Sequence, residues 1–167
     1  MDKIDFFSPA DGECASSSKP RFYLYDGGDS TPVCMKEELV RHDCTPVMNE
    51  SGSNIIIRPV DHVLYPETGG PMHCDAFLHD TGRDCLCFVE MKCVRCSWMS
   101  EAYGQLLQTV RDFISSHPQV AGSARIRRDY AATSKHPNFQ YSQSEAMHRF
   151  RCETRFSLRF ENCVSMD

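Results

Sequence analysis

The sequence predicts an α/β fold in which a mixed central β-sheet is flanked by helices. Short apolar and β-branched segments, separated by turn residues, follow one another between residues 54 and 94, which is the pattern of strands. A longer segment whose apolar residues have helical spacing comes next. The 167 residues of the chain suffice for one compact domain with a substantial core.

Three strands are predicted first in this core. Residues 54–60 are rich in isoleucine, residues 73–80 form the second strand, and residues 85–94 are apolar on both faces, as in a central strand. Thr81 and Gly82 are turn formers between the second and third strands, so these two strands are predicted to form a hairpin. An additional strand is predicted upstream, at residues 21–25.

A helix and a fourth strand complete the predicted core. Apolar residues recur at helical spacing from Met99 to Ser115, which predicts a helix there. After Pro118 and Gly122, residues 124–133 are predicted as the fourth strand. The expected order is therefore strand, strand, strand, helix, strand.

Apolar and polar residues alternate between Arg149 and Glu161, which predicts an extra C-terminal strand or hairpin that is half buried. Its outward arginines, with an upstream group, are candidates for binding nucleic-acid phosphates. The alternative is a solvated edge strand whose charges prevent aggregation. The arginines concerned are Arg125, Arg127, Arg128, Arg149, Arg151, Arg155 and Arg159.

Residues 1–20 are predicted to be a flexible N-terminal segment, and residues 21–167 a single domain with its core at about residues 54–133. The stretch from Met1 to Lys19 contains no apolar run of the kind that signal peptides and membrane spans need. We therefore expect a cytoplasmic protein with no membrane partner.

Two carboxylates and a lysine are predicted to meet at one end of the hairpin. Strand pairing carries Asp75 alongside Glu90, and the alternation of side chains places Glu90 and Lys92 on one face. A simple interpretation is a Glu–Lys pair at a strand end, because charged side chains are rarely buried without a partner. The alternative is a Mg²⁺ or Mn²⁺ site, because hard cations prefer one or two carboxylates together with water and phosphate oxygens.

With these residues and this order of elements, the stretch from Ile55 to Thr133 resembles the PD-(D/E)xK, or restriction-endonuclease-like, nuclease superfamily. The resemblance implies a restriction-endonuclease-like core. It also implies that Asp75 and Glu90 bind the metal and that Lys92 is the catalytic lysine.

Members of this superfamily often carry a glutamine on the helix after the lysine strand. Gln105 is favoured for that role here, with Gln108 as the second candidate, and an ordinary solvent-facing helix residue as the alternative for either. The chain departs from the superfamily pattern before Asp75, where it has His73 and Cys74 instead of a proline.

Two further carboxylates are candidate metal ligands. Asp61 follows the first strand and could reach the same ion from there. Glu38 lies in a short predicted helix at residues 35–41, although a surface carboxylate paired with a neighbouring lysine or arginine is the favoured interpretation for it.

The 10 cysteines raise a second kind of site. Cys93 and Cys96 form a Cys-x-x-Cys pair, but a zinc or iron–sulfur cluster normally needs a second such pair. Cys74, Cys85 and Cys87 lie in predicted strands, where free cysteine behaves as a small apolar residue. Reduced core cysteines are therefore favoured over a metal cluster.

The leading expectation is a Mg²⁺- or Mn²⁺-dependent nuclease that hydrolyses phosphodiester bonds, with DNA favoured over RNA as substrate. The competing expectation is a nuclease-like binding module that lacks catalysis and acts through nucleic-acid or protein interaction, and a Cys-bound metal protein is a third, weaker class. A small domain of this kind is also expected to need a homodimer or a partner protein.

Overall fold

The computed structural model describes residues 3–8, 14–28, 31–39, 44–65, 72–92, 97–133 and 141–167, and these form an α/β fold with two sheets. The helices are α1 (Trp98–Ser116), α2 (Pro118–Ser123) and α3 (Tyr141–Thr154). The strands are β1 (Ala15–Ser17), β2 (Arg21–Tyr25), β3 (Cys34–Lys36), β4 (Thr45–Met48), β5 (Ile55–Pro59), β6 (Ala76–Asp80), β7 (Cys85–Lys92), β8 (Ile126–Thr133), β9 (Ser157–Glu161) and β10 (Val164–Ser165).

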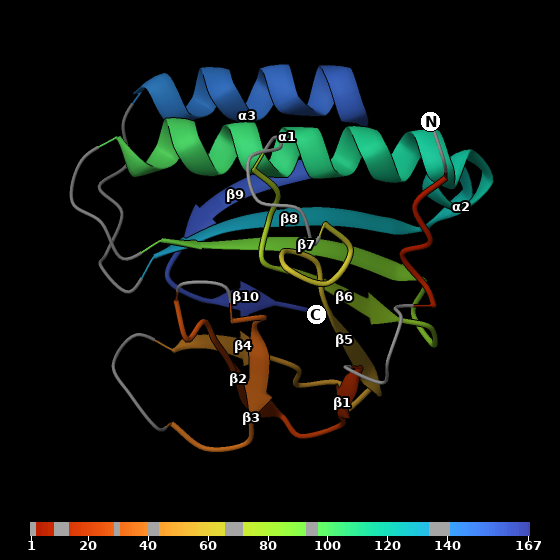
Figure 1. The fold of residues 1–167 in the computed structure, drawn as a ribbon, viewed down its shortest axis with the longest axis vertical. Helices are drawn as coiled ribbons and strands as arrows, with labels where there is room; N and C mark the ends of the chain where they lie inside the picture. The colour runs from red at the N-terminus through yellow and green to blue at the C-terminus, as the bar shows by residue number, and fades with distance from the viewer. Residues whose placement is uncertain are drawn as a thin grey trace.

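The larger sheet has six strands in the order β1-β5-β6-β7-β8-β9 (Figure 1). From β1 to β7 the neighbouring strands are antiparallel, whereas β7, β8 and β9 run parallel to one another. The predicted order of strand, strand, strand, helix, strand is confirmed by β5, β6, β7, α1 and β8. The crossover through α1 explains the parallel pairing, because parallel neighbours need a long connection.

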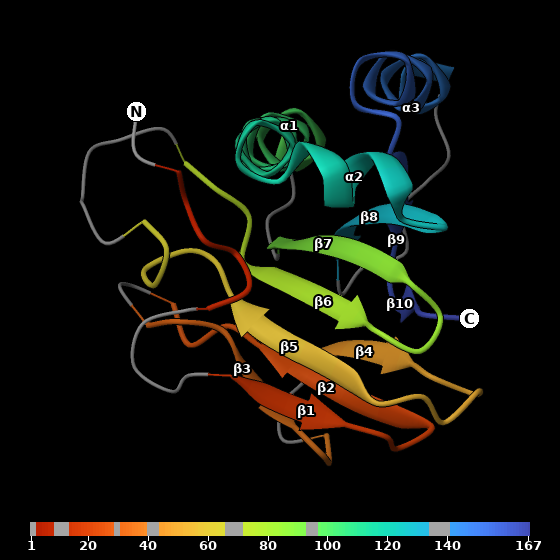
Figure 2. The same cartoon turned by 90° about the vertical axis from the view of Figure 1, so that its right-hand side faces the viewer.

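The smaller sheet has the order β10-β4-β2-β3 and packs on one face of the larger sheet, while the helices cover the other face (Figure 2). Strand β7 explains this layering, because its alternate residues enter two different cores. Leu86 and Phe88 join the core under α1, and Cys87 and Val89 join the core toward the smaller sheet. A strand that is apolar on both faces is therefore buried between two layers.

The predicted strand at residues 21–25 is confirmed as β2. Two described parts of the segment predicted to be flexible also pack onto the domain. Phe6 is fully buried in the core under α1, and β1 pairs with β5. None of the helices in the described residues is both long enough and apolar enough to cross a membrane.

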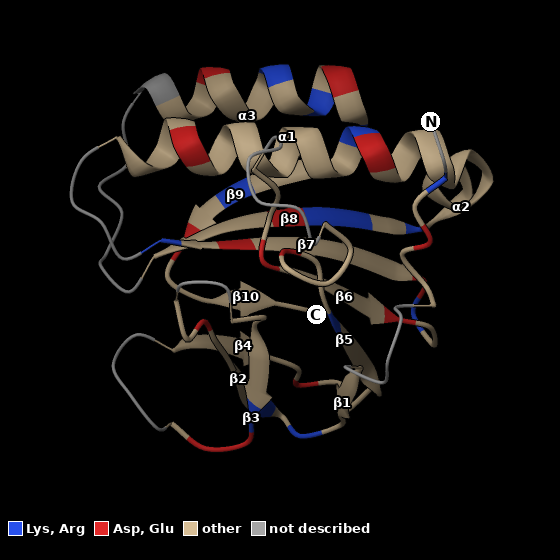
Figure 3. Cartoon of the chain, in the orientation of Figure 1, with Lys and Arg blue, Asp and Glu red and all other residues tan. Residues whose placement is uncertain are grey.

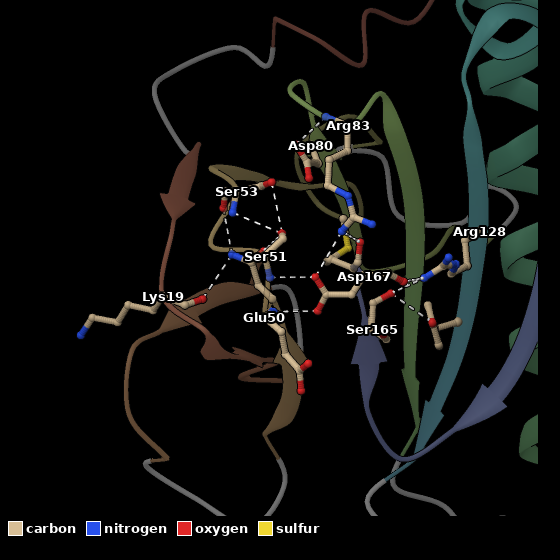
Figure 4. Close-up of polar contacts among 12 residues, drawn as sticks. Lys19, Glu50, Ser51, Ser53, Asp80, Arg83, Arg128, Ser165 and Asp167 are labelled. Atoms are coloured by element: carbon tan, nitrogen blue, oxygen red, sulfur yellow. Dashed lines mark hydrogen bonds and ion pairs between the residues drawn. The ribbon is translucent and has the colours of Figure 1, made fainter.

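The last residues join the two sheets (Figure 4). Strand β10 pairs with β4, while Arg128 from β8 donates hydrogen bonds from Nη1 to the carbonyl oxygens of Ser165 (2.9 Å) and Asp167 (2.8 Å). The carboxylate of Asp167 accepts from the backbone N–H groups of Glu50 (2.7 Å) and Ser51 (2.9 Å). The C-terminal segment thus connects β8 of the larger sheet with the turn after β4.

Two predicted elements are wrong. Residues 149–154, expected in a strand, belong to α3, because Ala146, Met147 and Phe150 recur at helical spacing and pack into the core under α1. Only the last part of the strand predicted from Arg149 to Glu161 is a strand, and this part is β9. The helix expected at residues 35–41 is also not formed in its described part, because Cys34–Lys36 pair with β2 as a strand and the chain bends at Glu37.

Candidate active site

Asp75 is held where the hairpin of β6 and β7 meets the end of β5. Its backbone N–H donates to the carbonyl of Val89 (3.1 Å), and its carbonyl accepts from the N–H of Val60 (2.9 Å). Its side-chain Oδ2 accepts a 2.7 Å hydrogen bond from the N–H of Met91. These three bonds fix both the backbone and the carboxylate of Asp75.

Glu90 lies beside Asp75. Ala76 pairs with Val89 in the antiparallel hairpin, so Asp75, just before Ala76, is opposite Glu90, just after Val89. The glutamate is almost completely buried, with 1 % of its surface exposed. Its Oε1 forms an ion pair with Lys92 Nζ at 3.0 Å, and its Oε2 has no hydrogen-bond partner among the described residues. The predicted meeting of two acids and one lysine is therefore present in the structure.

Both acids have a raised affinity for protons. Burial raises the pKa of Asp75 to about 7, against the effect of the Met91 N–H, and the nearby Asp26 and Asp61 raise it further. Burial and the charge of Asp75 raise the pKa of Glu90 well above its usual range, while Lys92 acts in the opposite direction. A site with too much negative charge for its surroundings is one that a cation would stabilise.

A pocket of about 310 Å³ opens in front of Asp75. Asp26, Asp61 and His62 line it together with Asp75. Asp61 thus lies at the site, as predicted from its position after β5, and its carboxylate pairs with His62 at 3.2 Å. Asp26 directly follows β2 of the smaller sheet. The packing of the two sheets brings Asp26 to the pocket, so the residues around it in the sequence give no sign of this position.

Gln105 is buried on α1, and its side-chain amide contacts the backbone of the segment before Asp75. Its Nε2 donates to the carbonyl of His73 at 3.2 Å, so its amide holds the segment that leads to Asp75. Its Oε1 is buried and has no hydrogen-bond partner in the part of the chain that the structure describes. Gln108 donates to Asp112 Oδ1 at 3.0 Å, one turn further along the helix.

The donor set suits a hard cation only if water or substrate completes it. Among the described residues, no three His, Cys, Asp or Glu side chains are gathered to hold a metal ion by themselves. Mg²⁺ commonly takes only one or two protein carboxylates, and Asp75 with the unpartnered Oε2 of Glu90 meets that need. Glu38 is exposed in the bend after β3, and nothing places it among the residues that line the pocket.

The cysteines of the described strands are free thiols. Cys74, Cys85 and Cys87 are fully buried in the two cores. Cys93 and Cys96, which form the Cys-x-x-Cys pair, lie outside the described residues.

The candidate phosphate-binding arginines are spread over several parts of the fold. Arg127 and Arg128 pair with Leu86 and Cys87, which places them roughly 10–13 Å along the strand from Glu90 at 3.3 Å per residue. Figure 3 shows this separation between the acidic part of β7 and the basic part of β8. Arg127 donates to the carbonyl of Ala121 (3.0 Å), so the side chains of Arg127 and Arg128 both have structural partners.

The other arginines are distributed over the C-terminal elements and the start of β8. Arg125 is exposed just before β8, Arg149 and Arg151 are exposed on α3, and Arg155 follows that helix with a φ of 68°. Arg149 pairs with Glu145 at 3.3 Å. Arg159 is exposed on β9, one residue before Phe160. Phe160 pairs with Ala131 and Ala131 pairs with Glu90, so Arg159 lies one residue along its strand from the row of Glu90.

Comparison of this chain with protein-family models, with curated proteins and with solved structures gives no match.

Proposed function

We propose that this protein is a Mg²⁺- or Mn²⁺-dependent phosphodiesterase of the nuclease type, with a restriction-endonuclease-like core and with DNA favoured over RNA as substrate. The observation that carries the proposal is the group formed by Asp75, Glu90 and Lys92 at one end of the hairpin. A cytoplasmic location and a homodimer or partner protein remain predictions from the sequence.

Glu90 supplies the strongest argument for a catalytic role over a purely structural one. This carboxylate is 1 % exposed, one of its oxygens has no partner within the described ranges, and a second acid lies beside it. Burial of such a charge lowers the stability of the fold. An ion pair that served only to close the strand end would not need Asp75 next to it. Strongly perturbed acids beside a pocket are typical of functional sites.

Each side chain of the site has a chemical task in hydrolysis. Asp75 and Glu90 would hold the cation, which when bound supplies a Lewis acid for the phosphoryl oxygens and an acidified water. Lys92 Nζ, 3.0 Å from Glu90 Oε1, places a positive charge where negative charge develops in the transition state. Asp61 and His62 line the pocket through which water and phosphate would enter.

The first test is cleavage of labelled single- and double-stranded DNA and RNA with Mg²⁺ or Mn²⁺, with EDTA as the metal-free control. We expect metal-dependent cutting by the parent. In Asp75→Asn, Glu90→Gln and Lys92→Met it should fall at least about 100-fold, which is the scale for loss of one group that stabilises the transition-state charge. Each substitution keeps the approximate side-chain volume, so circular dichroism should show a folded protein.

Glu101→Gln is the matched control, because it makes the same change as Glu90→Gln at an exposed acid on α1 that is not among the residues lining the pocket. It should cut like the parent. A folded parent that cuts none of the four substrates with either metal would refute the proposal. Binding of nucleic acid without cutting would favour instead a binding module that retains the fold without catalysis.

A further inference from the structure

Asp112 on α1 is the centre of a hydrogen-bonded cluster next to the candidate site. Its Oδ2 accepts from the hydroxyl of Tyr65 at 2.9 Å and lies 3.2 Å from Nε2 of His73. Its Oδ1 accepts from Gln108 at 3.0 Å. One carboxylate on a helix therefore binds side chains from two separate segments of the chain.

Those two segments carry the acids of the pocket. Tyr65 follows Asp61 and forms an isolated bridge with it, while His73 lies two positions before Asp75. The rings of Tyr65 and His73 stack with their centroids 3.3 Å apart and an interplanar angle of 8°. Asp112 and the ring stack thus tie both segments to one point on the helix.

The next residues of the chain are also bound to α1. The carbonyl of His73 accepts from Gln105 (3.2 Å), and the N–H of Cys74 donates to the hydroxyl of Thr109 (2.9 Å). Asp75 comes directly after these bonds and is itself fixed to β7. Along this segment, every residue from His73 to Asp75 has a hydrogen bond that limits where the Asp75 carboxylate lies.

We infer that Asp112 is a positioning residue: through Tyr65 and His73 it holds the Asp75 carboxylate in place against the Met91 N–H. Its contribution to hydrolysis rests on the proposed function, whereas the positioning itself does not. Without Asp112, the hydroxyl of Tyr65 and the ring of the nearly buried His73 lose their hydrogen-bond acceptor. The segment from His73 to Asp75 must then shift for His73 to find another acceptor.

Hydrogen exchange at the Met91 N–H measures this positioning directly, because that N–H donates to Asp75 Oδ2. Its rate would be measured by NMR in the parent, Asp112→Ala, Asp112→Asn and Gln108→Ala. The N–H of Phe88, which donates to the buried Asp129 on the same sheet (3.0 Å), reports global opening. We expect Asp112→Ala to accelerate exchange at Met91 at least about tenfold more than at Phe88, the scale of removing one hydrogen bond to a charged group.

Asp112→Asn is the conservative variant, because an amide oxygen has two lone pairs and can accept from both Tyr65 and His73. It should leave Met91 exchange within about threefold of the parent, the change expected when both hydrogen bonds are kept. Gln108→Ala should do the same, because it removes only the contact to the other oxygen of Asp112. Equal acceleration at Met91 and Phe88, or none at Met91, in Asp112→Ala would overturn the inference.

Cleavage assays separate this inference from the proposed function. If the parent cuts nucleic acid, Asp112→Ala should lower kcat at least about tenfold with KM for the nucleic acid nearly unchanged, because small misplacements of a catalytic group reduce the rate strongly. An unchanged kcat would refute a contribution of this positioning to hydrolysis while leaving the nuclease in place. If the parent does not cut, selective exchange at Met91 still establishes the positioning and only the nuclease proposal fails.

Discussion

At the scale of single residues, the main feature is the number of buried or half-buried acids on adjoining strands. Asp75 lines the pocket, Glu90 lies beside it, and Asp129 is fully buried in β8. Asp129 Oδ1 accepts from the N–H of Phe88 (3.0 Å), and its Oδ2 has no partner among the residues that the structure describes. Burial therefore raises the pKa of Asp129 well above its usual range. Burial in the sheet therefore raises the pKa of Asp75, Glu90 and Asp129, whereas hydrogen bonds at the surface lower the pKa of Asp5.

The raised pKa of Asp75 predicts how stability changes with pH in the metal-free protein. Its pKa is about 7 in the fold and near 4 in the unfolded chain. Between these values the folded state binds more protons, so its stability falls as pH rises from about 4 to about 7 and then levels off. Asp75→Asn removes this loss and should raise Tm above pH 7 by a few degrees, at about 2–4 °C per kcal/mol.

The measurement is thermal unfolding from pH 4 to pH 8 in the presence of EDTA. The Tm difference between Asp75→Asn and the parent should be small near pH 4 and largest above pH 7. Asp5 gives an opposite control, because N–H groups of Phe7 and Ser8 lower its pKa. Asp5→Asn should lower stability at neutral pH and lose that effect in acid. A Tm difference for Asp75→Asn that does not vary with pH would contradict the prediction.

At the scale of elements, α1 and β10 depend on contacts with distant parts of the chain. Helix α1 covers the larger sheet with Leu106, Val110 and Phe113 and binds the segment before Asp75 with its polar side chains. Strand β10 has only two residues, which is far too short to be stable without its side-chain and backbone partners. The bonds from Arg128 are therefore structural.

Arg128→Ala should lower stability without altering contacts to nucleic acid. It removes two hydrogen bonds from a charged donor to the carbonyls of Ser165 and Asp167, a loss of about 1.5–3 kcal/mol. That corresponds to a Tm decrease of roughly 3–12 °C. The N–H of Met166, which bonds to Met48 (2.9 Å), should also exchange faster.

Arg125→Ala, at an exposed neighbouring position, should leave Tm within about 1–2 °C of the parent, as is usual for surface substitutions. Arg128→Ala with an unchanged Tm but weaker nucleic-acid binding would show that the side chain serves the ligand and not β10.

At the scale of the whole molecule, charge is distributed unevenly. The chain has a formal net charge of -5, the candidate pocket is acidic, and the arginines of α3 and β9 lie on elements that follow it in the chain. Arg159 is the arginine of this group whose strand position comes closest to the row of Glu90. A phosphate backbone would therefore be attracted by the C-terminal elements and would reach the acids only with a cation present.

Nucleic-acid affinity and its dependence on salt test this distribution. In Arg151→Ala/Arg155→Ala/Arg159→Ala, the slope of log K against log salt concentration should become shallower by about 0.9 for each phosphate that the protein no longer neutralises. The substitutions should weaken binding to all sequences alike, because phosphate contacts carry no sequence information. Fluorescence anisotropy at several salt concentrations measures both quantities.

The matched control removes three exposed lysines elsewhere, Lys3, Lys19 and Lys36, and so changes net charge equally. It should alter the salt slope less than the arginine variant does. Equal slopes for the two triple variants would show that net charge, and not the C-terminal surface, decides binding.

The sequence by itself determined the elements whose signals are local. The isoleucine-rich β5, the apolar β7, the turn at Thr81 and Gly82 and the helical spacing in α1 each depend on residues that are close in the chain. Hairpin pairing is equally local, which is why the amino-acid sequence alone predicts that Asp75 meets Glu90.

Only the tertiary structure decided the features that depend on distant partners. Apolar and polar residues alternate in residues 149–154 as in a strand, but these residues belong to α3, because Phe150 packs into the core under α1. Asp26 reaches the pocket through the packing of two sheets, Gln105 binds the backbone of His73, and Arg128 binds the C-terminal carbonyls. Such contacts join residues far apart in the chain, and their free energy depends on a geometry that short-range patterns do not contain.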